Sequence, residues 1–350
     1  MPYTHFQYIA YQVPTALYDN TINEVVSGFP PGLECDRIER VRVLATPGDA
    51  RTRLRRLAAV VDMAASKVQD CGTNSSTLKV FLAPEFYFRP PVPNEYYKHN
   101  TYPREDALAI FTAIDSMFAH KDFTDWLIVG GTVLWNNGSL SDLPANPRVY
   151  MNTAVYVQGG KDNGLKFVEK RLASTIDGVP VAMTPAYTND PNVRSIHSDW
   201  DVRKQHIFSV GNVGFGLEVC LDHLVCTVKN IRSEYYFSKH AVNLHVLSAG
   251  GMTIESNAVA ADINGYILRN DGVPNDIKGQ IELMKVTGYT NNQGQQQSAF
   301  SKFARESQLQ RVAHQEVIPI PVGNMQVPKT NIDPNEFQQS LIFYPVEPLI

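Results

Sequence analysis

The chain has 350 residues, a formal net charge of −4 and a hydrophobic content of 43%. This hydrophobic share excludes a globally disordered chain and is enough for a sizeable core. The weakly acidic balance, without a block of basic residues, argues against nucleic acid as a partner.

The four cysteines are Cys35, Cys71, Cys220 and Cys226. Their irregular spacing matches neither a disulfide framework nor a zinc site, which favours a reducing compartment and predicts no metal. The first residues lack the basic segment and apolar core of a secretory signal. No stretch approaches the ~18 apolar residues of a membrane helix. We therefore expect a cytoplasmic protein without a membrane partner.

The first half of the chain alternates between predicted strands and helices. Residues 1–36 hold a possible strand, FQYIAYQV, but are expected to form an N-terminal extension. Leucine, valine and alanine side chains recur every three or four residues over 50–72, which predicts an amphipathic helix. The other predicted elements are strands at 37–45, 78–88, 126–135, 148–160 and 165–173 and a helix near 105–120.

The second half begins with a sparsely patterned, proline-containing segment at 174–204, which we expect to be a loop insertion. The elements predicted after it are two strands within 205–220, helices at 223–239 and 253–263, and strands at 241–249, 264–272, 311–322 and 340–346. Alternating strands and helices predict a layered α/β fold, and the strand pairs without helices predict antiparallel parts. We expect one domain over 1–350, in which the strands of 276–350 complete the sheets.

Three chemically active side chains lie at or near the ends of predicted strands. Glu85 follows LKVFLAP, Lys170 lies in FVEKRL, and Cys220 lies in VGFGLEVCLD. A buried glutamate needs a compensating partner, which a lysine supplies, and a thiol next to both becomes a usable nucleophile. Glu85 would act as the general base, while Lys170 and the backbone N–H of Leu221 would stabilise a tetrahedral intermediate. This chemistry requires no cofactor.

These three motifs, in this order, resemble the signatures of the nitrilase (carbon–nitrogen hydrolase) superfamily. Weaker matches are IVGGTV, MNTAVYV, VNLHVLSAGG and AVAADINGYILRNDG, so that the resemblance spans roughly residues 37–275. It implies a four-layer-forming α-β-β-α sandwich of the nitrilase type and a homodimer or higher homo-oligomer. It also implies hydrolysis of non-peptide C–N bonds by Glu85, Lys170 and Cys220.

The sequence departs from the family pattern next to the cysteine and after the lysine. Glu218 stands where an aliphatic residue is usual, HLVC follows in place of Phe-Pro-Glu, and Asp177 is the nearest carboxylate to an absent second glutamate. Residues two apart on a strand share a face, so Glu218 is expected to point toward the site. We take Glu218, His223, Phe86 and Asp177 as candidate substrate-binding residues. The two carboxylates would favour a cationic substrate.

Several functions remain open at this point. The leading prediction is hydrolysis of a small-molecule amide through a thioester on Cys220. The alternatives are a nitrilase attacking a nitrile, an N-acyltransferase with an amine as acceptor, and a catalytically inactive binding module. In the last case Cys220 would be an inert buried thiol, the commonest state of a free cysteine.

Overall fold

The computed structural model describes residues 2–15, 48–70, 76–90, 101–136, 150–172, 205–233, 240–273, 281–290, 306–320 and 339–350. The predicted strand at 37–45 and the predicted insertion at 174–204, with Asp177, lie outside these ranges. Cys35 and Cys71 also lie outside them.

One of the two sheets has seven strands in the order β12-β13-β1-β2-β3-β4-β5. Its strands are β1 (His5–Gln12), β2 (Thr77–Leu82), β3 (Trp126–Asn136), β4 (Tyr150–Gln158), β5 (Leu165–Glu169), β12 (Glu316–Ile320) and β13 (Gln339–Pro348). Strands β1, β2 and β3 are parallel, and the flanking pairs are antiparallel.

The other sheet has six strands in the order β11-β10-β9-β8-β7-β6. They are β6 (Ile207–Val210), β7 (Val213–Val219), β8 (Leu244–Ala249), β9 (Tyr266–Asp271), β10 (Ile281–Thr290) and β11 (Glu306–Val312). Strands β7, β8 and β9 are parallel. The carboxyl ends of β7 and β8 therefore meet at one edge, where functional side chains of α/β folds commonly gather.

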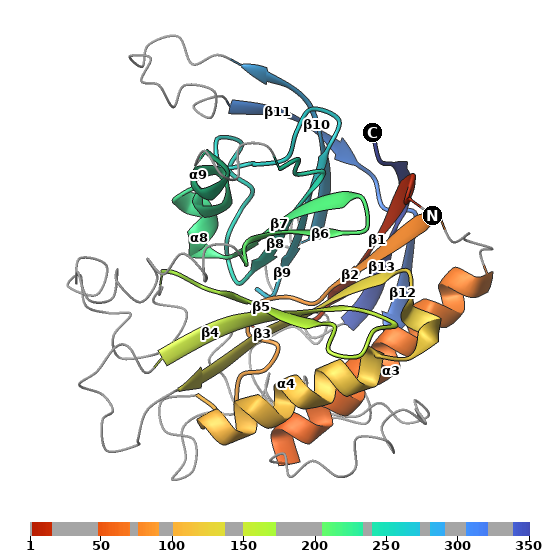
Figure 1. The fold of residues 1–350 in the computed structure, drawn as a ribbon, viewed down its shortest axis with the longest axis vertical. Helices are drawn as coiled ribbons and strands as arrows, with labels where there is room; N and C mark the ends of the chain where they lie inside the picture. The colour runs from red at the N-terminus through yellow and green to blue at the C-terminus, as the bar shows by residue number, and fades with distance from the viewer. Residues whose placement is uncertain are drawn as a thin grey trace, which may run out of the picture.

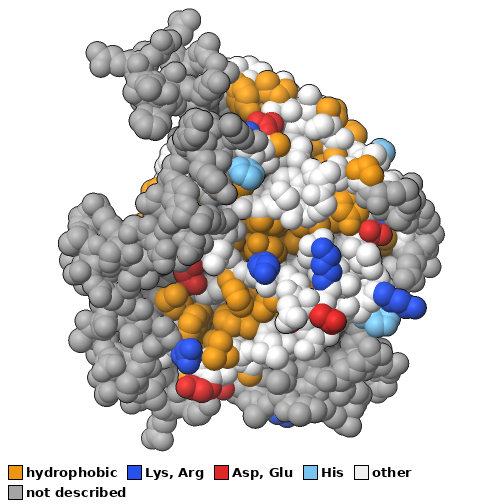
Figure 2. Space-filling model, in the orientation of Figure 1, with side chains coloured by type: hydrophobic (Ala, Val, Ile, Leu, Met, Phe, Trp, Pro, Cys, Tyr) orange, Lys and Arg blue, Asp and Glu red, His pale blue; other side chains and the backbone are white. Residues whose placement is uncertain are grey.

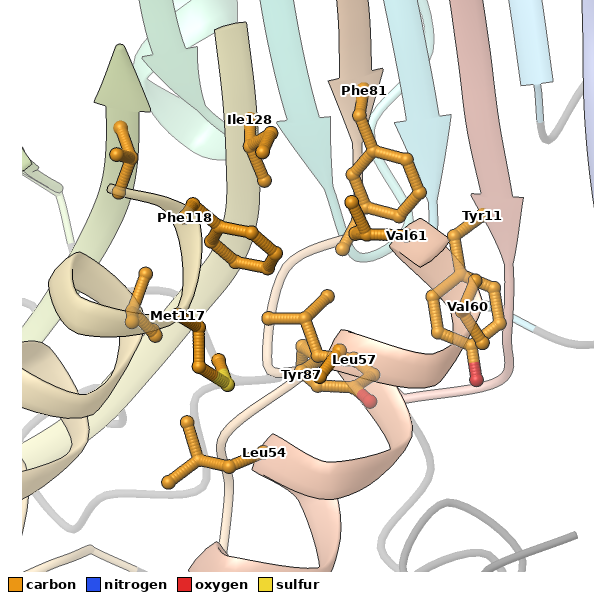
Figure 3. Packing of buried hydrophobic residues seen from close by; sticks show 14 of the residues in the cluster. Tyr11, Leu54, Leu57, Val60, Val61, Phe81, Tyr87, Met117, Phe118 and Ile128 are labelled. Atoms are coloured by element: carbon orange, nitrogen blue, oxygen red, sulfur yellow. The ribbon is translucent and has the colours of Figure 1, made fainter. Parts of the chain in front are cut away.

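Helices α3 (Gly48–Asp70) and α4 (Arg104–Phe118) cover the outer face of the seven-stranded sheet (Figure 1). Figure 3 shows Leu57 and Val61 of α3 and Phe118 of α4 directed toward Phe81 and Ile128 of the strands. A short 3-10 helix, η2 (Lys121–Phe123), connects α4 to β3. The six-stranded sheet carries α8 (Leu221–Leu224) and α9 (Thr227–Ser233).

A second core lies between the sheets. Phe6 and Tyr8 of β1 belong to the same buried cluster as Phe215 and Leu217 of β7, whereas Ile9 faces the helices. This alternation follows from the two-residue period of a strand that is buried on both faces. The layers therefore follow the order helix, sheet, sheet, helix, and the predicted mixed α/β fold is confirmed.

The surface gives two further observations. Among the described residues, no helix combines the length and hydrophobicity needed to cross a bilayer. On the face in Figure 2, hydrophobic, acidic and basic side chains of the described residues are interspersed.

The structure corrects the expectation for the N-terminus. The described part of residues 1–36 is not an appendage, because β1 lies between β13 and β2 inside the seven-stranded sheet. Strand β10 was not predicted, although it pairs with both β9 and β11.

Several predicted elements also differ from the structure. The single strand predicted at 311–322 is divided between the end of β11 and β12, which lie in different sheets. The strand predicted at 78–88 ends at Leu82, and the helix predicted at 223–239 is broken into α8 and α9 by a turn at Cys226, whose φ is 57°. Residues 253–263 form turns and irregular chain, not a helix.

Candidate active site

Glu85 lies three residues after the end of β2, in a loop bonded to both sheets. Its N–H donates to Ala249 O at 3.3 Å, and its carbonyl accepts from Thr15 Oγ1 at 2.5 Å. The next N–H, of Phe86, donates to Thr132 Oγ1 at 2.8 Å. These bonds hold the backbone of Glu85 and Phe86 in place. Glu85 itself has 0% exposed surface.

Lys170 follows β5 directly, is 5% exposed, and donates through Nζ to Glu85 Oε1 at 2.9 Å. Asn152 of β4 donates through Nδ2 to the same oxygen at 2.9 Å, and its carbonyl accepts the Lys170 N–H at 2.9 Å. Two donors from neighbouring strands therefore orient the Glu85 carboxylate. A buried carboxylate at such a position needs this compensation, because burying an unpaired charge is costly.

Cys220 lies between β7, which ends at Val219, and α8, which begins at Leu221. Its φ of 45° and ψ of −112° lie in a region that non-glycine residues rarely occupy. Its N–H donates to Ser248 O at 2.9 Å, its Sγ lies 3.9 Å from Gly250 O, and the residue is 5% exposed. The thiol is free. A sharp turn at a strand–helix junction is an arrangement that presents a side chain at the sheet edge.

The end of β8 joins the two halves of the site. Ala249 accepts the Glu85 N–H, and Gly250 accepts from the Cys220 thiol. A Cβ on Gly250 would stand 2.9 Å from Glu85 Oε2 and 2.9 Å from the Phe86 ring. Glu85 and Cys220 therefore contact the same short segment, Glu85 from the loop after β2 and Cys220 from the end of β7.

Asp222 connects the cysteine turn to the lysine segment. Its fully buried carboxyl accepts from Arg171 N and Leu172 N, each at 2.9 Å. Burial raises the pKa of Asp222 to about 8, although these two N–H groups and the Lys170 charge act to lower it. The carboxyl thus holds the residues that follow Lys170 against the turn that follows Cys220.

Phe86 and Leu221 are each adjacent in sequence to a residue of the predicted triad. Lys170 Nζ stands 5.7 Å from the centre of the Phe86 ring, and Arg89 Cζ stands 4.7 Å from it. Leu221, the first residue of α8, follows Cys220 directly. Phe86 is fully buried, so it forms a wall of the site rather than an exposed contact surface.

Glu218 and His223 do not line the site as expected. Both are fully buried and are bonded to each other, with Glu218 Oε2 at 2.6 Å from His223 Nδ1. The expectation assumed that β7 continues to Cys220, but the strand ends at Val219 and the chain turns there. Glu218 therefore gives no support to the expectation of a cationic substrate.

Two residues of this region were missed by the sequence analysis. Asn152 lies in the quoted MNTAVYV motif and His245 in VNLHVLSAGG, but only the pairing of strands distant in sequence shows what they contact. A buried polar side chain in an otherwise apolar strand was the available signal, because such groups require partners.

No family model matches the sequence, and no curated protein matches it. Among solved structures, the chain is similar to Saccharomyces cerevisiae Nit3, a member of branch 10 of the nitrilase superfamily. The two are 11% identical over 81% of this chain and 83% of that one, with a TM-score of 0.42.

It is also similar to an amidase from Nesterenkonia sp., with 11% identity, coverage of 78% and 80%, and a TM-score of 0.38. A mutant of the AN1 amidase with acrylamide added at its active-site cysteine gives 12% identity, coverage of 77% and 81%, and a TM-score of 0.38. We base the functional proposal below on the geometry of Glu85, Lys170 and Cys220.

Proposed function

We propose that the protein hydrolyses the C–N bond of a small-molecule amide, with Cys220 as nucleophile, Glu85 as general base and Lys170 as the cation that stabilises the intermediate. The observation that carries this proposal is the buried bond of 2.9 Å between Lys170 Nζ and Glu85 Oε1, beside a segment that also binds the Cys220 thiol. Buried ion pairs next to a nucleophile are a recurrent arrangement of catalytic sites.

The proposed reaction begins with transfer of the Cys220 thiol proton to Glu85 as the sulfur attacks the amide carbon. The negative charge on the former carbonyl oxygen is stabilised by Lys170 and by the backbone N–H of Leu221. Collapse of this intermediate breaks the C–N bond. Glu85 returns the proton to the leaving nitrogen, and an amine or ammonia departs from a thioester on Cys220.

The second half of the reaction uses water. Glu85 removes a proton from a water molecule, whose oxygen attacks the thioester carbon, and the C–S bond breaks to give a carboxylic acid. The thiolate recovers its proton from Glu85, which restores the starting state. Asn152 supports this exchange by donating to Glu85 Oε1, since it keeps the carboxylate oriented through both halves.

The test is a panel of aliphatic amides and nitriles with ammonia and carboxylic acid as measured products. We expect release from at least one amide, an acyl adduct on Cys220 in quenched intact-mass spectra, and no turnover by Cys220→Ala. Adding an amine acceptor separates hydrolysis from acyl transfer, because a transferase would then form the N-acyl amine. Turnover that survives Cys220→Ala would overturn the proposal.

The family resemblance also leads us to propose a homodimer or higher homo-oligomer. Multi-angle light scattering of the full chain measures this directly, and a monomer at all concentrations would exclude it.

A further inference from the structure

A second buried network surrounds the backbone of Cys220 on the helix side of the six-stranded sheet. Glu218 of β7 accepts three hydrogen bonds: from His223 Nδ1 at 2.6 Å, from His245 Nε2 at 3.0 Å and from Val228 N at 2.5 Å. The two histidines and Glu218 have no exposed surface. The network therefore ties β7 to β8, α8 and α9.

The outer nitrogens of both histidine rings fix their protonation. His223 Nε2 accepts the Glu255 N–H at 3.1 Å, and His245 Nδ1 accepts the Ala260 N–H at 3.1 Å. A backbone N–H can only donate, so each of these ring nitrogens lacks a proton. Each neutral ring then carries its proton on the nitrogen that faces Glu218.

The positions of these protons distinguish a metal site from a hydrogen-bonded network. The ligand atoms of Glu218, His223 and His245 lie within 4.8 Å of one another, a spacing that could hold a metal ion. A metal-bound histidine donates its second ring N–H to an acceptor. Both second nitrogens here face donors instead, which fits a hydrogen-bonded network and not a metal site.

The network connects residues on both sides of Cys220. Glu218 stands two residues before Cys220 and His223 three residues after it, so their side-chain bond spans the residue with φ 45°. The His223 N–H also donates to Cys220 O at 2.9 Å. A rare backbone conformation persists only where the surroundings hold it.

We propose that the Glu218 carboxylate, with His223 and His245 as its donors, is a positioning group that fixes the Cys220 backbone for nucleophilic attack. This inference rests on the proposed role of Cys220 as nucleophile. None of the three side chains touches substrate in this assignment, so their effect on the reaction is transmitted through the turn.

The test is Glu218→Gln, which keeps the size of the side chain. Because all three partners donate, the new NH₂ group must face at least one donor. We expect the rate of Cys220 alkylation by iodoacetamide to fall on the order of 10- to 100-fold, as expected for a misplaced reacting group, with a shifted pH profile. The kcat of hydrolysis should fall with little change in KM.

The matched control is Gln339→Leu. Gln339 is a buried side chain that accepts from Tyr11 OH at 2.6 Å and Arg56 Nε at 2.9 Å on the helix side of the other sheet. Its loss should lower thermal stability and leave the alkylation rate of Cys220 unchanged. If Glu218→Gln lowers stability but alkylates with the wild-type rate and pH profile, the positioning role is overturned.

If Glu218→Gln does not fold, a pair of His223 variants tests the positioning role instead. His223→Asn keeps an N–H donor near the Nδ1 position, whereas His223→Leu removes it. We expect the asparagine variant to alkylate several-fold faster than the leucine variant, and equal rates for the two would overturn the inference. A wild-type Cys220 no more reactive than Cys226 would instead contradict the proposed function itself.

Discussion

Two residues of the candidate site have strained backbone conformations. Phe86, next to Glu85, has a φ of 62°, and Cys220 has a φ of 45°. Such conformations cost roughly 1–3 kcal/mol each for non-glycine residues. They are held by bonds from Phe86 N to Thr132 Oγ1 at 2.8 Å and from Cys220 N to Ser248 O at 2.9 Å. The geometry of both groups is thus set by their neighbours.

A substitution of Asn152 tests whether a neighbouring side chain sets the orientation of Glu85. Asn152→Leu removes one donor to Glu85 Oε1 and leaves the other donor that the described residues supply, Lys170, in place. General-base catalysis contributes roughly 10²–10⁴-fold, and a poorly oriented base forfeits part of it. We therefore expect kcat/KM to fall about 10- to 100-fold, measured by steady-state ammonia release.

Asn136→Leu is the matched control for Asn152. Asn136 is also a buried asparagine of the seven-stranded sheet, but it donates to Thr101 Oγ1 at 3.1 Å and to Tyr102 O at 3.2 Å. It should destabilise the fold without a comparable loss of kcat/KM. Equal losses of activity in the two variants would mean that Asn152 has only a structural role.

At the scale of elements, the end of β8 is the part that brings the two sheets' contributions together. Gly250→Ala places a methyl group 2.9 Å from Glu85 Oε2 and 2.9 Å from the Phe86 ring, so one of them must move. We expect kcat/KM to fall by about 100-fold, because displacement of a reacting group by about 1 Å has effects of this size.

Gly130→Ala is the comparison for Gly250, since its new methyl group would meet Val155 at 3.4 Å and Leu57 at 3.5 Å, close to ordinary contact distances. It should retain near wild-type activity and stability. Wild-type kinetics for Gly250→Ala would show that Glu85 is not held where we describe it.

His245, which joins β8 to Glu218 of β7, is predicted to make the free energy of unfolding depend on pH. Burial lowers the pKa of His245, outweighing the Glu218 carboxylate, which raises it. The unfolded chain therefore takes up a proton on His245 more readily than the folded protein does. The free energy of unfolding is highest above the unfolded pKa of 6.5 and decreases as the pH falls below that value. The largest possible slope for one group is about 1.4 kcal/mol per pH unit.

His245→Gln keeps an N–H donor toward Glu218 but does not titrate. The difference in free energy of unfolding between wild type and this variant should therefore narrow from pH 7.5 to pH 5, measured by urea unfolding at each pH. A difference that is constant or widens over this range contradicts the assigned neutral state of His245.

The elements also show which parts of the fold are accessible to sequence reasoning. Buried strands such as β2 and β3 are predicted because their apolar runs are continuous. The helix predicted at 253–263 does not form because the Glu255 and Ala260 N–H groups bind the rings of His223 and His245. These tertiary bonds replace a helical hydrogen-bond ladder, and no local pattern encodes them.

For the whole molecule, the sequence motifs predict that Glu85, Lys170 and Cys220 share a site; in the structure Lys170 bonds Glu85, and Glu85 and Cys220 contact the same segment after β8. The same patterns could not place β1, whose partners are β2 and the C-terminal β13. Pairing between strands more than 300 residues apart, as in His5 with Pro348, is set by global packing. For the same reason the bond between Asn152 and Glu85 was not predicted.

The two sheets are joined by polar bonds as well as by their shared apolar core. Asn270 of β9 donates through Nδ2 to Tyr11 O at 2.9 Å and to Leu82 O at 2.6 Å, across the sandwich. Asn270→Leu leaves these carbonyls without that donor, at a cost of about 1–3 kcal/mol for each carbonyl left unsatisfied. Urea unfolding should show this loss.

Asn212→Ala is the control for Asn270. Asn212 also bridges the sheets, through Tyr3 N at 2.7 Å and Tyr3 O at 2.9 Å, but at an exposed position where water replaces the lost bonds. Its effect on the free energy of unfolding should stay within about 0.5 kcal/mol. Similar small effects for both variants would show that the Asn270 bonds do not hold the sheets together.

The most direct measurement is the alkylation rate of Cys220 by limiting iodoacetamide over pH 5–9, mapped by mass spectrometry for wild type and Glu85→Gln. An ordinary thiol has a pKa near ~8.5 and reacts slowly below it. If Glu85, Lys170 and Cys220 form one catalytic unit, Cys220 is labelled first, well below that pH, and Glu85→Gln changes its pH profile. Labelling of Cys220 no faster than of Cys226, or an identical profile in Glu85→Gln, would contradict the assignment.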